Sequence, residues 1–173
     1  MTPASMALFS VAQAASRILT GAISDAALKW RDGIPRPAFL TVAALMGATA
    51  HSILAVATSP AWFILGVALA GAAFGSIWPL MVLIVGEIFG TANMATNYLL
   101  YDGVSSATGT LLLSKFVTQK VYESHIMQPD SSSSHNTTCY GLECFAMSHW
   151  IIVGLGFSCV VAGSQMVRLT RDI

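Results

Sequence analysis

The sequence predicts an all-α integral membrane protein of about five transmembrane helices, and composition and charge spacing carry this prediction. Of the 173 residues, 55% are hydrophobic and only 9% are charged, with a mean hydropathy of +0.69. A soluble domain usually carries about 25% charged residues, which cover its surface. In addition, windows of membrane-spanning length with few or no charges recur along the whole chain.

Five windows reach the roughly 20 mostly apolar residues that a helix needs to cross a bilayer. The first holds only Arg17 and Asp25 as charges, and the fourth holds Asp102 and ends near Lys115. The other three carry no charge. The predicted spans are residues 3–28, 38–58, 61–86, 95–116 and 146–167. They leave no room for a sizeable soluble domain, and the longest connection, 118–145, is expected to be an exposed outer loop.

The net charge of zero excludes some function classes. A nucleic-acid binder needs a basic face, which this sequence lacks, so no nucleic-acid partner is expected. No Cys and His spacing is typical of a metal site. The stretch Gly103-Val104-Ser105 invites comparison with a serine hydrolase, but Ser106 follows and no histidine is placed as a base. We therefore expect that the protein is not an enzyme and that it binds no metal and no cofactor.

The distribution of basic residues predicts the orientation of the chain. The loop after the first span and the C-terminal tail hold most of them, and four spans separate the two, so both are expected to be cytoplasmic. The long loop then lies on the non-cytoplasmic side. The protein is expected in the plasma membrane or in an endomembrane. The loop carries a possible glycosylation site at Asn136 and a possible disulfide between Cys139 and Cys144. Both modifications favour a non-cytoplasmic side.

Charges within the spans are candidate functional residues because they are costly in lipid. Arg17, Gly21 and Asp25 are spaced by four residues and share one helix face. Arg17 either binds an anion or stabilises the bundle by snorkelling or by pairing with Asp102. Asp102 could instead carry a proton or an ion. Asp25, the basic loop with Arg36, and Glu87 form either a cytoplasmic salt-bridge cluster or an incidental set of solvated charges.

Other residues within the spans favour packing roles. Gly71 and Gly75 form a Gly-x3-Gly pair that allows close helix approach, and Pro79 is expected to bend that helix after Trp78. His51 is interpreted as a packing residue rather than a proton relay, and His149 as interfacial.

Three stretches resemble the major facilitator superfamily and, within it, the plant nodulin-like (nuclear-fusion-defective) branch. The first runs from Ser16-Arg17 through Gly21-Ala22-Ile23-Ser24-Asp25 to Pro35-Arg36-Pro37. The second runs from Phe74 through Gly75-Ser76-Ile77-Trp78-Pro79 to Glu87-Ile88-Phe89-Gly90, and the third is 139–145. The resemblance implies that the five spans correspond to helices 8–12 of a twelve-helix fold, and that Gly21, Asp25, Arg36 and Glu87 form a cytoplasmic gate.

The first stretch is also similar to the monocarboxylate transporters. That resemblance implies that Arg17 engages a substrate carboxylate, whereas Gln13 stands where those transporters have a proton-coupling aspartate. The combined expectation is a partial C-terminal half of a secondary transporter over residues 1–173, with Arg17 and Asp102 binding a small organic solute. The missing N-terminal half would be its partner. The alternative is a membrane interaction or assembly subunit that transports nothing.

Overall fold

Prolines and polar residues set the helix boundaries in the computed structural model, which describes residues 3–29, 33–126 and 143–171. Helix α1 spans Pro3–Leu28, and α2 spans Arg36–Val56. The first residue of α2, Arg36, stands between Pro35 and Pro37. Proline suits the first turn of a helix because an N–H at that position would have no acceptor within the helix. Helix α3 spans Pro60–Thr108, and the Ser59 hydroxyl caps it by accepting from the Trp62 N–H. The π-helical η1 (Gly109–Thr118), α4 (Gln119–Ile126) and α5 (Glu143–Arg171) follow.

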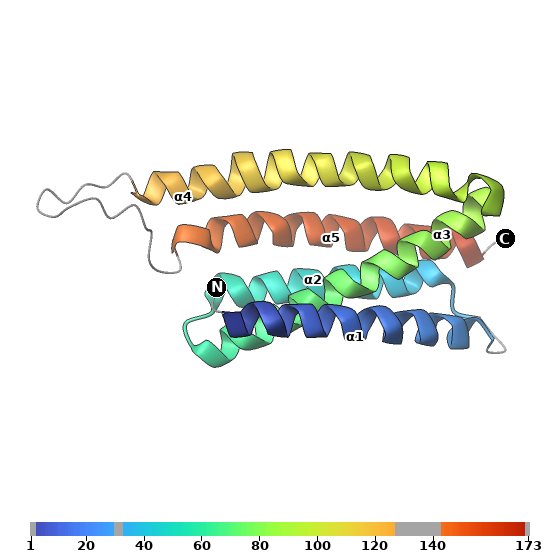
Figure 1. Ribbon diagram of the computed structural model, residues 1–173, viewed down its shortest axis with the longest axis horizontal. Helices are drawn as coiled ribbons and strands as arrows, with labels where there is room; N and C mark the ends of the chain where they lie inside the picture. Colours follow the sequence, from blue (N-terminus) through green and yellow to red (C-terminus); the bar gives the residue numbers. More distant parts are fainter. Residues whose placement is uncertain (1–2, 30–32, 127–142, 172–173) are drawn as a thin grey trace, which may run out of the picture.

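The long third helix reverses direction at Gly90. The continuous apolar stretch Pro60–Ser124 has 65 residues, which at about 1.5 Å per residue is far longer than a hydrocarbon core of about 30 Å. Gly90 has φ 72° and ψ 163°, a conformation nearly restricted to glycine. Figure 1 shows the chain turning back there. We call 60–89 the first arm and 91–126 the second arm.

The two arms match two predicted spans, 61–86 and 95–116, and the reversal at Gly90 lies between these spans, as expected. The backbone stays helical through Pro79, and within α3 only Gly90 departs from helical φ and ψ. The second arm also continues to Ile126, and α5 begins at Glu143. Residues 118–126 and 143–145 are therefore helical, although they were expected to belong to the loop.

The helices run along a common direction and form a bundle (Figure 1). Helix α1 packs mainly on α3, and α2 packs on both α3 and α5. The end of α1, the start of α2, the reversal at Gly90 and the end of α5 lie at one end of the bundle (Figure 1). We call this the Gly90 end. The distribution of basic residues predicts that this end faces the cytoplasm.

Small side chains fill the interior, while large apolar ones cover the outside. The buried apolar residues include six alanines: Ala27, Ala43, Ala48, Ala50, Ala55 and Ala73. Leu99, Leu100 and Phe116 are more than half exposed. Small residues let helix backbones approach each other in a membrane, and lipid accepts the large apolar side chains. Four helical stretches are long and apolar enough to cross a membrane, so the chain has an all-α membrane architecture.

Candidate functional site

One arginine joins three helices at the Gly90 end. The guanidinium of Arg36 donates through Nη2 to Oδ1 of Asp25 at 2.5 Å and through Nη1 to Oε1 of Glu87. Asp25 lies in the last turn of α1, Arg36 is the first residue of α2, and Glu87 lies three residues before Gly90. We call these three side chains the Arg36 clamp. The clamp brings together three of the four residues expected to form a gate.

Local sequence explains why these side chains meet. Pro35 and Pro37 fix the start of α2, which places Arg36 at the mouth of the turn after α1. The first arm ends at Gly90, so Glu87 also lies at this end of the bundle. The fourth predicted gate residue, Gly21, lies one turn before Asp25, and a Cβ built there would meet nothing within 4 Å. Gly21 therefore has no close packing contact to explain its identity.

The clamp is only moderately strong. The Arg36 side chain is 12% exposed, but those of Asp25 and Glu87 are 58% and 47% exposed. Ion pairs that water reaches on one side typically contribute about 0.2–1 kcal/mol each. The buried Nε of Arg36 also has no hydrogen-bond partner among the described residues, which is unfavourable. Such an arrangement can hold the helix ends together and still separate at modest cost.

Glycines allow α1 and the first arm to approach closely, several turns away from the clamp. A Cβ on Gly71 would lie 2.6 Å from the Phe9 carbonyl oxygen, and one on Gly75 would collide with the Gln13 carbonyl oxygen and Ser16 Oγ. One turn along, the hydroxyls of Thr20 and Ser76 are 2.8 Å apart across the same interface. The Gly-x3-Gly spacing predicted a close helix approach, and Gly71 and Gly75 lie where the first arm packs closely on α1.

Arg17 and Asp102 do not pair with each other. Among the described residues, the only ion pairs are the two of the clamp. Arg17 is exposed on α1, whereas Asp102 is half-buried on the second arm and lines a cavity of about 350 Å³. Tyr98, in the same cavity wall, lies within electrostatic range of both charges. Of the two stabilising roles considered for Arg17, direct pairing with Asp102 is therefore absent.

The sequence interpretation missed a histidine pair between α2 and α5. Nδ1 of His51 and Nδ1 of His149 are 2.9 Å apart, and the ring centroids are 5.2 Å apart. A hydrogen bond between two Nδ1 atoms requires one of them to carry the proton and the other to accept it. The only signal in the sequence was that each histidine lies in an apolar window, and nothing there showed that the two would meet.

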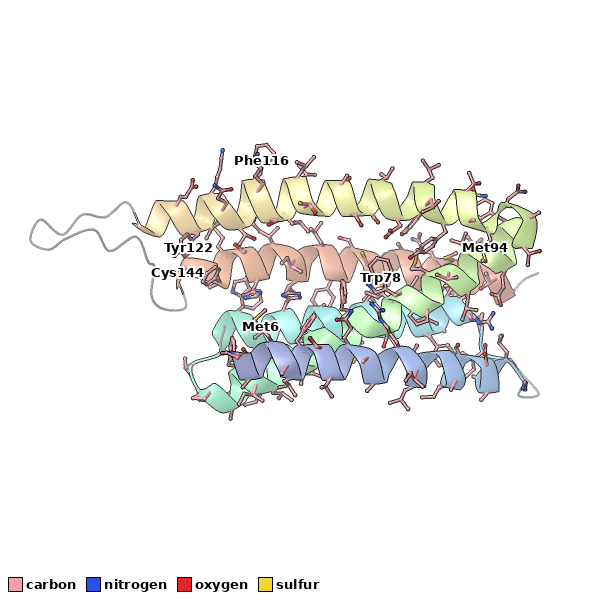
Figure 2. All side chains as sticks on the ribbon, in the orientation of Figure 1. Met6, Trp78, Met94, Phe116, Tyr122 and Cys144 are labelled. Atoms are coloured by element: carbon pink, nitrogen blue, oxygen red, sulfur yellow. The ribbon has the colours of Figure 1, made fainter. Side chains whose placement is uncertain are left out.

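The predicted features of the outer loop lie mostly outside the described residues. Asn136 and Cys139 are not among them, so the glycosylation and the disulfide stay predictions. Cys144 is buried in the first turn of α5, and Cys159 is an exposed free cysteine. Figure 2 shows Tyr122 and Cys144 at the end of the bundle opposite Met94. Within the described segments, no three His, Cys, Asp or Glu residues are placed to hold a metal ion.

The bundle therefore defines a polytopic α-helical membrane protein in which the two ion pairs of the Arg36 clamp join three helices at one end. No family model and no solved structure matches the sequence. The chain is similar to "Probable transporter MCH1" of Gibberella zeae, with 29% identity over 169 residues, covering 84% of this chain and 29% of that protein. It is also similar to "Probable transporter MCH1" of Yarrowia lipolytica, with 27% identity over 165 residues, covering 91% of this chain and 32% of that protein. The chain therefore spans less than a third of these relatives.

Proposed function

We propose that the chain is part of a major-facilitator-type secondary transporter that moves a small organic anion such as a monocarboxylate. In this proposal the protein is not an enzyme. Its similarity along most of its length to two proteins named as probable transporters supports a transport role. In alternating access, two groups of helices rock around a central site and expose it to one side at a time. Because the relatives are about three times longer, the proposal includes further helices, an N-terminal half, that complete the cavity.

The observation that carries this proposal is the Arg36 clamp. It joins α1, α2 and the first arm at a single end of the bundle, which is the end that the basic residues assign to the cytoplasm. A link of this kind stabilises the state in which that end is shut, and it must break when the end opens. Its exposed carboxylates and moderate strength fit a contact that is made and lost in every cycle.

Arg17 supplies the anion-binding group in this proposal. A guanidinium can bind a carboxylate through two parallel hydrogen bonds, and inside a membrane segment it remains charged. No acidic residue among those described pairs with Arg17, so its charge is available to a solute. A membrane assembly subunit that transports nothing remains the second candidate, because the glycine-lined face of α3 is also suited to helix pairing.

Uptake of a labelled monocarboxylate tests the proposal in cells that express the longest in-frame product containing this chain. Arg17→Gln should abolish saturable uptake while the amount of protein in the membrane stays the same. Arg168→Gln, which removes an exposed arginine on α5 that has no ion pair among the described residues, is the matched control and should leave uptake intact. Unaltered uptake in Arg17→Gln would sink the assignment, and absence of uptake in every form would favour the assembly subunit.

A further inference from the structure

The cavity beside Asp102 has an unusual combination of walls. It lies between the two arms of α3, and the residues that line it include four aromatic ones and one carboxylate: Phe74, Trp78, Tyr98, Tyr101 and Asp102. Figure 2 shows Trp78 midway along the bundle. We call this cavity, of about 350 Å³, the Asp102 pocket.

The Asp102 carboxylate has no cation beside it in the described part of the chain. Its recorded side-chain contact is the hydroxyl of Ser106, which donates to Oδ1 over a long 3.5 Å. Asp102 is only partly exposed and belongs to an apolar, membrane-spanning stretch. A carboxylate in such a place usually pairs with a positive charge or marks a path for one. No described cation forms an ion pair with Asp102, and Arg17, whose charge reaches Tyr98, is not among the residues that line the pocket.

The aromatic walls favour the same sign of ligand charge. The face of an aromatic ring is negative and attracts a cation within about 6 Å of its centre. The rings of Phe74 and Trp78 meet edge to face at 5.9 Å, so their faces point in different directions. Rings of this kind around a single carboxylate suit an organic ammonium group, whereas the carboxylate would repel an anionic group.

We infer that the Asp102 pocket binds the ammonium group of an organic solute, with Asp102 as its counter-ion and the aromatic rings around its apolar part. This goes beyond the anion site at Arg17. A further step rests on the proposed transport function. If that function holds, the transported solute carries a carboxylate that binds Arg17 and an ammonium group that binds Asp102. The solute would then be a zwitterion and not a simple monocarboxylate.

Tryptophan fluorescence of the full chain in lipid nanodiscs tests the pocket directly. Three probes share one ring and differ in charge: phenethylammonium, the neutral 2-phenylethanol and the anionic 3-phenylpropanoate. Phenethylammonium should change the emission and bind at least tenfold more tightly than the other two, and Trp78→Phe should remove most of the signal. Equal affinities for all three probes would overturn the inference, and so would a preference for the anion.

Variants separate this inference from the proposed function. Asp102→Asn should weaken phenethylammonium binding at least tenfold and Asp102→Glu should largely preserve it. Glu123→Gln, which removes an exposed carboxylate on α4 that accepts a hydrogen bond from Gln119 and does not line the pocket, should change nothing. Circular dichroism checks that each variant is folded. Arg17→Gln should leave phenethylammonium binding intact even where it abolishes uptake, so unaltered uptake in Arg17→Gln contradicts only the transport proposal. Unchanged binding in a folded Asp102→Asn variant contradicts only the pocket.

Discussion

Nδ1 of His51 on α2 lies 2.9 Å from Nδ1 of His149 on α5, so a hydrogen bond joins these two helices. The partners are separated by 98 residues. Removing one of them leaves the other polar nitrogen without its partner, whereas removing both leaves no unpaired group in this contact.

This contact predicts non-additive effects on stability. His51→Leu alone or His149→Leu alone should lower the free energy of unfolding by about 1–3 kcal/mol. The double variant should be less destabilised than the sum of the two single variants. Thermal unfolding in detergent measures all four proteins. Strict additivity would show that the two rings do not interact in the folded protein.

Gly75 should not tolerate a side chain, because α1 occupies the space that its Cβ would need. Gly75→Ala should push α1 away from the first arm and destabilise the protein by about 1–3 kcal/mol, as overpacking does in cores. Gly103→Ala on the same helix is the matched control, since a Cβ there meets nothing within 4 Å. Equal melting temperatures for the two variants would argue against this helix crossing.

Gly90 should be required for the reversal between the two arms. Its φ of 72° is unfavourable for any residue with a Cβ, although a Cβ built there would meet no described atom within 4 Å. The cost therefore comes from the backbone, and Gly90→Ala should lose about 1–3 kcal/mol. Gly109→Ala, at a helical glycine that also faces open space, should lose none. A fully stable Gly90→Ala protein would mean that the chain turns elsewhere.

The fold class could be predicted from the sequence because a charge-free window is a local property of the chain. The place of the reversal was harder to predict. Pro79 can remain inside a helix in a membrane, where neighbouring groups compensate for the lost hydrogen bond, whereas Gly90 adopts a conformation that few other residues can adopt. A reversal was expected between the spans 61–86 and 95–116, but that it would rest on the single non-helical residue Gly90 was not.

The site could be predicted only in part, because contacts between helices depend on how each helix is rotated. The sequence nominated Asp25, Arg36 and Glu87, and the structure brings the three together. Periodicity could not show that His51 meets His149, nor that Asp102 faces aromatic rings and not Arg17. Each of these contacts joins segments that are distant along the chain, and neither partner carries a local signal for the other.

The most direct test of the account is monocarboxylate uptake by a variant without the clamp. Arg36→Gln removes both ion pairs and leaves Asp25 and Glu87 close together without the positive charge between them. The Gly90 end should then fail to stay shut, and uptake should fall at least tenfold at an unchanged amount of protein in the membrane. Arg168→Gln should retain uptake. Normal uptake by Arg36→Gln would contradict the account, because a gate held by this clamp could not work without it.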